Sequence, residues 1–173
     1  HAAKTSVMAE SIPDNGGVFF VPAFTGLGAP HWNTGARGMI IGITAATSKE
    51  QITRAALESM AYQTRDLLEE MERNSGIKLK ELKVDGGASK NDFLMQFQAD
   101  ILNCRVVRPK DIETTELGAC YLAGLGCGIF KREDEITELW EDDRVFEPQM
   151  DEETRENLYA QWCKAVEKSK DWL

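Results

Sequence analysis

The chain has 173 residues, enough for one domain with a hydrophobic core. Its hydrophobic fraction of 42% and charged fraction of 28% are typical of globular proteins, and its net charge of −9 argues against a nucleic-acid-binding surface, which needs clustered Lys and Arg. No apolar run reaches the length of a membrane span and the N-terminus lacks a signal-peptide pattern, so we expect a cytoplasmic protein whose partners include no nucleic acid and no membrane.

The cysteines follow no metal-binding pattern. Their spacing matches no zinc motif, and neither of the two histidines is near them in the sequence, so we predict no metal site. We expect reduced thiols, mostly buried, as in a cytosolic protein. The four cysteines are Cys104, Cys120, Cys127 and Cys163.

The N-terminal part predicts a short helix, a strand and a loop. Residues 1–17 form a polar lead-in with at most one helical turn around residues 7–11, and the apolar run 18–21 between Gly17 and Pro22 predicts a buried strand. Residues 22–32 are too rich in Gly and Pro for a regular element, so they predict a shaped loop that serves function or simply fills a core. With no visible carboxylate partner, His31 is interpreted as a surface or packing residue.

A second buried strand is predicted over residues 39–44, followed by a long helix. Ser48 and Gln51 form a capping-box pattern, and apolar residues at helical spacing extend the helix from about Lys49 to about Arg73. Its polar residues Glu58, Gln63 and Arg65 are interpreted as polar-face or interface residues without a catalytic role.

The central stretch, residues 82–91, predicts a strand, a paired-glycine turn and the start of a helix that ends near residue 103. Gly86 and Gly87 end the strand and allow another molecule to approach the backbone, while Ser89 is the predicted N-cap, with Asp92 three residues later. Such a turn can hold a nucleotide on free N–H groups, and Asn91 could contact a base edge. These residues alone favour the alternative of a purely structural turn.

The C-terminal half predicts one more strand and three more helices. Residues 105–107 form the strand, and Thr114 or Thr115 caps a helix over residues 117–125, whose small side chains predict close packing against a neighbouring element. We further expect a helix within residues 133–139, a solvated turn at 141–144, an extended piece near Phe146 and a last helix that starts at residues 151–153. The predicted apolar stripe of that helix is Leu158, Trp162, Ala165 and Val166.

The alternation of strands and helices from residue 39 to residue 125 predicts an α/β layered fold. Several segments also resemble, in the same order and spacing, signature stretches of the glycerol kinases of the FGGY carbohydrate kinase family. The resemblance covers nearly the whole chain. The matching segments are residues 21–32, 36–38, 42–44, 55–66, 84–88, 91–100 and 117–124.

The resemblance implies a partial RNase H-like domain of the actin/hexokinase superfamily, with a sheet flanked by helices. Residues 1–173 would be the C-terminal part of the nucleotide-binding domain, with a core over about 17–130 and a C-terminal helical segment over about 131–173. It implies transfer of the ATP γ-phosphate to glycerol with Mg²⁺, in an enzyme that is expected to form a homo-oligomer. The implied adenosine contacts are Gly86, Gly87, Ala88 and Asn91.

The resemblance also implies what this stretch lacks. Such kinases are roughly three times longer, a size consistent with two domains, and their catalytic base, glycerol contacts and phosphate-binding loops correspond to segments upstream of residue 1. We therefore predict no catalytic residue here and expect the isolated chain to be inactive. Two alternatives stay open: another sugar or polyol kinase of the same family, and a non-catalytic α/β interaction module.

Overall fold

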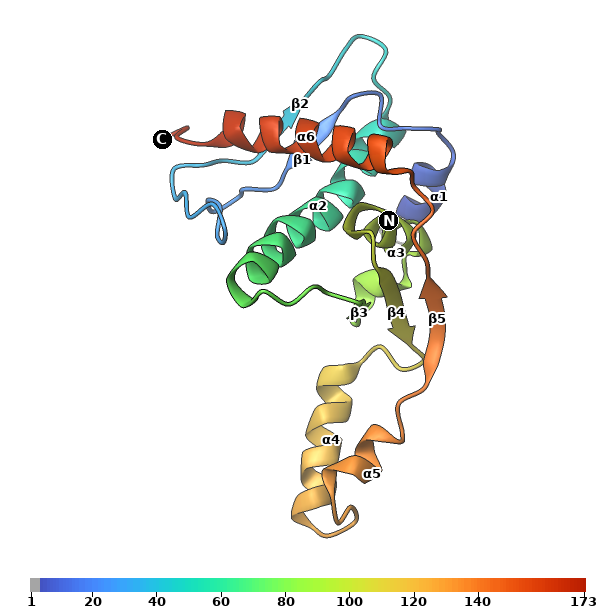
Figure 1. The fold of residues 1–173 in the computed structure, drawn as a ribbon. Helices are drawn as coiled ribbons and strands as arrows, with labels where there is room; N and C mark the ends of the chain where they lie inside the picture. The colour runs from blue at the N-terminus through green and yellow to red at the C-terminus, as the bar shows by residue number, and fades with distance from the viewer. Residues whose placement is uncertain (1–3) are drawn as a thin grey trace.

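The computed structural model describes residues 4–173 and has a mixed α/β architecture with two small sheets (Figure 1). In chain order the elements are α1 (Thr5–Glu10), β1 (Phe19–Val21), β2 (Met39–Ile41), α2 (Lys49–Ser75), β3 (Glu81–Lys83), the 3₁₀ turn η2 (Gly87–Lys90), α3 (Asp92–Leu102), β4 (Arg105–Pro109), α4 (Thr114–Gly126), α5 (Glu133–Thr137), β5 (Asp142–Phe146) and α6 (Glu152–Ser169).

The two sheets lie on different sides of the central helices. Strands β1 and β2 pair antiparallel, whereas β4 pairs in parallel with β3 and antiparallel with β5. Helices α2, α3 and α6 pack between the sheets, and α4 with α5 extends away from this body beyond the far end of β4 (Figure 1). The predicted α/β class, with helices flanking sheets, is confirmed.

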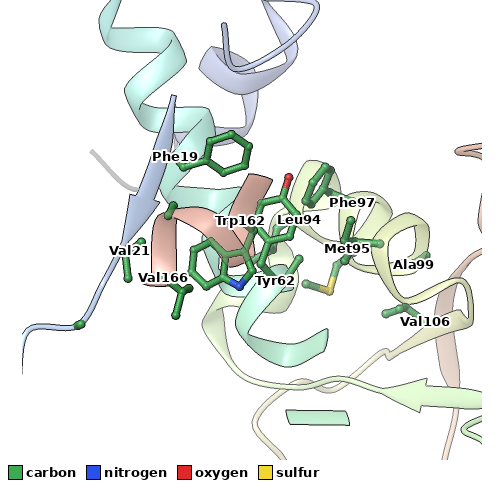
Figure 2. Packing of buried hydrophobic residues seen from close by; sticks show 14 of the residues in the cluster. Phe19, Val21, Tyr62, Leu94, Met95, Phe97, Ala99, Val106, Trp162 and Val166 are labelled. Atoms are coloured by element: carbon green, nitrogen blue, oxygen red, sulfur yellow. The ribbon is translucent and has the colours of Figure 1, made fainter. Parts of the chain in front are cut away.

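The core is built on an aromatic cluster that joins four elements (Figure 2). Tyr62 of α2 stacks on Trp162 of α6 with ring centroids 5.3 Å apart, and Phe97 of α3 meets Tyr62 edge-on at 5.4 Å. Phe19 of β1 lies 6.0 Å from the same Tyr62 ring. Residues 131–173 therefore complete the core, since they supply Trp162 and Phe146 to it.

The predicted ends of the helices depend on local capping and are mostly confirmed. The backbone N–H of Gln51 donates to Ser48 Oγ at 3.3 Å, and the backbone N–H of Ser48 donates to Gln51 Oε1 at 2.9 Å. Asp151 caps α6 by accepting from the Thr154 N–H at 2.8 Å, and this backbone hydrogen bond lowers the pKa of the Asp151 carboxyl. Helix α2 ends at Ser75, slightly beyond the predicted end, and Gly76 with φ +70° is its C-cap.

Strand β2 differs from the prediction of a buried strand. It covers only residues 39–41, because Gly42 leaves the extended conformation with φ +87°. Ile40 and Ile41 are 39% and 38% exposed, since β2 pairs with β1 on one side only and none of the described elements covers its outer face. The apolar run was therefore insufficient evidence of burial.

Three predictions in the C-terminal half are also wrong. Residues 142–144 begin β5 instead of forming a solvated turn, because their backbone pairs with β4. Neither threonine caps α4: Glu113 occupies the cap position without a side-chain bond, and the Thr114 hydroxyl donates to Asp85. Of the glycines in α4, only Gly124 packs closely, and its neighbour is the ring of Phe130 just beyond the helix.

The thiols are all free, but only Cys104 is buried, so the prediction of mostly buried cysteines is wrong. Cys120 and Cys127 lie on or at the end of α4, which extends away from the core, and Cys163 is an exposed residue of α6. Partial burial nevertheless raises the pKa of Cys163, as burial raises that of Cys104.

We therefore expect Ellman's reagent to label Cys120 and Cys127 of the folded chain rapidly, Cys163 more slowly, and Cys104 only after denaturation. Thiolate attack needs both access and ionisation: Cys163 has access but a raised pKa, whereas Cys104 is buried and also has a raised pKa. A Cys104→Ala variant should lose only the labelling that appears on denaturation. Rapid labelling of all four thiols in the native chain would contradict the placement of Cys104.

Candidate functional site: the turn at residues 86–91

The predicted site lies at the carboxyl end of the parallel strands β3 and β4, the edge of an α/β sheet where ligands commonly bind. Gly86 adopts φ +75°, which favours glycine, and its N–H donates to the Ile112 carbonyl at 2.8 Å. A Cβ placed on Gly86 or Gly87 would meet no atom within 4 Å. The outer side of the turn therefore faces open space.

The turn is closed by Ser89 and followed by a cap on Asn91. The Ser89 N–H and hydroxyl both donate to the Gly86 carbonyl, at 3.1 and 2.7 Å. Asn91, rather than Ser89, caps α3, since its Oδ1 accepts from the Leu94 N–H at 3.1 Å. The prediction of Ser89 as cap is wrong because its hydroxyl is used inside the 3₁₀ turn.

The predicted base-contacting group of Asn91 is partly engaged. Its Nδ2 donates to Thr5 Oγ1 at 3.3 Å while its Oδ1 caps the helix. A carboxamide has two N–H donors and two acceptor lone pairs, so one donor and one lone pair are still available for a ligand. The side chain is half-buried, which limits its approach to one side.

Gly87 and Ala88 expose the turn's free donors. Both residues are exposed, and neither backbone N–H donates to any group within residues 4–173. Two successive unpaired N–H groups at the start of a 3₁₀ turn can bind an anionic or carbonyl oxygen. The structure thus brings all four predicted residues together in one turn with an accessible surface.

A separate cavity of about 470 Å³ lies between the ends of these strands, at Lys83 and Pro109, and helix α4. Lys83 lies over the Trp140 ring with its Nζ 4.4 Å from the centroid, and Tyr121 and Leu117 line the helix side. None of the residues 86–91 lines this cavity. It is therefore not part of the candidate site.

A buried polar cluster around Asp66 was not predicted from the sequence. Asp66 is 7% exposed and accepts from Tyr159 Oη at 2.7 Å and from Trp162 Nε1 at 2.9 Å, and His31 Nε2 lies 3.2 Å from its Oδ2. The interpretation of His31 as lacking a carboxylate partner is wrong. Burial and the hydrogen bond to Asp66 raise the pKa of Tyr159. The cluster joins the loop 22–32 to α2 and α6, so we assign it a structural role.

The polar residues of α2 also make contacts that the sequence did not reveal. Glu58 is buried, not on a polar face: it accepts from Arg54 Nε and Asn15 Nδ2, each at 2.7 Å, and burial raises its pKa. Arg65 bonds Glu69 of α2 and Glu156 of α6, as an interface residue does.

Within residues 4–173, no group of three or more His, Cys, Asp or Glu side chains is arranged to hold a metal ion. No helix in this range combines the length and apolar character that crossing a membrane requires.

Comparison with known proteins identifies the family. Residues 2–127 match the C-terminal domain of the FGGY family of carbohydrate kinases. Glycerol kinase 2 of Sulfolobus acidocaldarius is 62% identical over 165 residues, 95% of this chain and 33% of the relative. Glycerol kinase 2 of Thermotoga maritima is 60% identical over 172 residues, 99% of this chain and 35% of the relative. The chain thus spans about a third of the length of the curated relatives it matches.

Solved structures agree in fold. The crystal structure of Plasmodium falciparum glycerol kinase with ADP has a TM-score of 0.87 at 38% identity, covering 98% of this chain and 34% of that one. A ligand-bound xylulose kinase from Lactobacillus acidophilus has a TM-score of 0.81 at 26% identity, covering 97% and 34%. The match of one family domain to most of the chain, with the same fold throughout, means that the chain belongs to the FGGY family of carbohydrate kinases, in the region of its C-terminal domain.

Proposed function

We propose that the chain is the adenosine-binding, C-terminal part of an ATP-dependent glycerol kinase, which converts ATP and glycerol to ADP and glycerol 3-phosphate. The relatives at about 60% identity are glycerol kinases, and a similar solved structure is a glycerol kinase with ADP. We further propose that the whole kinase is a cytoplasmic homo-oligomer. The exposed apolar face of β2 is consistent with contacts to other protein surfaces.

The observation that carries the proposal is the open turn with two free N–H donors. Gly86 sets the backbone, Gly87 and Ala88 present the donors, and Asn91 lies at the start of α3 with one donor to spare. In this proposal the turn binds and orients the adenosine. The remainder of the kinase then binds the γ-phosphate that is transferred and contributes the catalytic base and the glycerol contacts.

The residues near the turn do not fit a Mg²⁺ site, although kinases of this class use the ion with ATP. Mg²⁺ requires free oxygen ligands. The nearby carboxylates are engaged, since Asp85 accepts from Thr114 and Asp92 pairs with Arg108 and Arg144. We therefore derive no step through a metal within this chain.

The first test titrates ADP into the full-length kinase and its Gly87→Val and Asn91→Ala variants by calorimetry. Valine at 87 fills the open side of the turn, so we expect ADP binding to be lost or to weaken more than tenfold. Asn91→Ala removes a polar contact worth on the order of 1 kcal/mol, so the affinity for ADP should fall several-fold. Because Asn91 also caps α3, an Asn91→Asp variant, which keeps the capping oxygen, is the matched control for the cap. Unchanged ADP affinity in both Gly87→Val and Asn91→Ala would refute the adenosine assignment.

The isolated 173-residue chain should show no kinase activity. The proposal places the catalytic base and the glycerol pocket outside it, so residues 86–91 alone leave the acceptor unbound. The measurement is ATP-dependent formation of glycerol 3-phosphate against a blank preparation. Turnover above the blank would show that the chain contains a complete active site.

A second candidate is a kinase for another polyol or sugar, which the likeness to the xylulose kinase favours. Steady-state turnover of the full-length enzyme on glycerol, xylulose and gluconate distinguishes the two. Nucleotide binding without turnover on any polyol or sugar would instead support a non-catalytic module.

A further inference from the structure

Arg108 of β4 makes an unusual set of contacts behind the turn. Its side chain is only 12% exposed, and its Nη1 donates to the Ser89 carbonyl at 2.8 Å and to Asp92 Oδ1 at 2.7 Å. On the other edge of the guanidinium, Nε donates to Asp143 Oδ2 at 2.8 Å. One side chain thus links the turn, the first residue of α3 and the antiparallel strand β5.

The Ser89 contact determines where the turn lies relative to the sheet. The turn is held at its start by the bond from Gly86 N–H to Ile112 and at its end by the bond from Arg108 to Ser89. Neither bond uses the N–H groups of Gly87 and Ala88. Arg108 therefore fixes the backbone on the buried side and leaves the donors on the open side free.

The charge of Arg108 is already balanced within the protein. Burial alone would lower the pKa of its guanidinium, but hydrogen bonds to Asp92 and Asp143 raise the pKa by more, so the group stays charged. Asp92 also pairs with Arg144 at 2.5 Å. Two arginines thus face two carboxylates, so the charge of Arg108 is balanced by Asp92 and Asp143 and the guanidinium is not free to pair with a phosphate.

We propose that Arg108 is a positioning residue for the nucleotide: it holds the Ser89 carbonyl and thereby places the Gly87 and Ala88 N–H donors, without touching the nucleotide. This inference rests on the proposed adenosine site. The contacts of Arg108 also explain why the residue is an arginine. Its planar guanidinium can donate to a carbonyl and two carboxylates at once, whereas the ammonium of a lysine is a single-point donor.

The test compares Arg108→Met, Arg108→Lys and Asp143→Asn in the full-length kinase. Asp143→Asn is the matched control, because it weakens the far side of the same guanidinium and keeps the bond to Ser89. We expect Arg108→Met to raise the Kd for ADP and the KM for ATP about tenfold, as loss of a charged hydrogen bond does. Arg108→Lys should rescue part of this, and Asp143→Asn should stay within about twofold.

A split between the two substrates separates positioning from general stability. The KM for glycerol should change less than about twofold in all three variants. Equal rises in both KM values for Arg108→Met, or ADP affinity in Asp143→Asn as poor as in Arg108→Met, would overturn the inference. If circular dichroism shows that Arg108→Met is unfolded, Arg108→Lys serves as the test in its place. ADP affinity equal to wild type in Arg108→Lys would then overturn the inference.

The outcome for Gly87→Val tells this inference apart from the proposed function. Lost ADP binding in Gly87→Val, with wild-type binding in Arg108→Met, leaves the adenosine site standing and removes the role of Arg108. Wild-type binding in both refutes the site and the inference together.

Discussion

Trp162→Ala should lower the free energy of unfolding by about 3–5 kcal/mol, the range for deleting a large buried aromatic side chain. Trp162 is 1% exposed, stacks on Tyr62 and donates its Nε1 hydrogen to Asp66 at 2.9 Å. The substitution leaves a cavity between α2 and α6 and removes one of the donors to a buried carboxylate. Guanidinium denaturation of the 173-residue chain, followed by circular dichroism, measures the effect.

Two controls separate the contributions. Trp162→Phe keeps an aromatic ring but loses the N–H, and since Tyr159 and His31 still face Asp66, the loss should be clearly smaller. Trp172→Ala removes a tryptophan that is 74% exposed and should cost less than about 0.5 kcal/mol. Equal destabilisation by Trp162→Ala and Trp172→Ala would contradict the core in Figure 2.

Gly42→Ala should have the second large effect, a loss of about 3 kcal/mol or more. The residue has φ +87°, where an L side chain costs about 1–2 kcal/mol. In addition, its Cβ would lie 2.0 Å from the Gly17 carbonyl oxygen, so backbone on one side must move, at a typical overpacking cost of about 1–3 kcal/mol. Denaturation of the same chain gives the measurement.

Gly17→Ala is the matched control for the backbone strain alone. Its φ of +77° is similar, but a Cβ there meets no atom within 4 Å. We expect it to cost only the strain, about 1–2 kcal/mol. Similar losses for the two alanines would mean that the close approach of residues 17 and 42 does not contribute to stability.

Features set by neighbouring residues could be predicted from the sequence. The capping box of Ser48 and Gln51, the Asp151 cap and the strand–turn–helix at residue 86 each depend on groups within a few positions. The prediction of Ser89 as the cap of α3 was wrong, because a 3₁₀ turn over residues 87–90 moves the cap to Asn91. Both residues are good caps, and no local sequence pattern predicts such a turn.

Features set by distant partners could not be predicted. Asp66 meets Tyr159 across 93 positions and His31 across 35, and Asn15 reaches Glu58 across 43, so no spacing rule connects them. Burial of β2 was inferred from apolar residues, but burial depends on a covering layer and not on the strand itself. For the candidate site, the four residues could be named from the resemblance, whereas nothing in the sequence pointed to Arg108, whose partners Ser89 and Asp143 lie 19 and 35 positions away.

The stack between α2 and α6 has a consequence for how the protein is made. Asp66 and Trp162 are 96 positions apart, and β1 also packs against α6, so the core remains open during translation until α6 has been synthesised. Contacts that join such distant segments slow folding because the intervening chain must first be ordered. The apolar faces of β1 and α2 therefore stay uncovered from the time they are synthesised until α6 follows, a period in which chaperones can bind exposed hydrophobic segments.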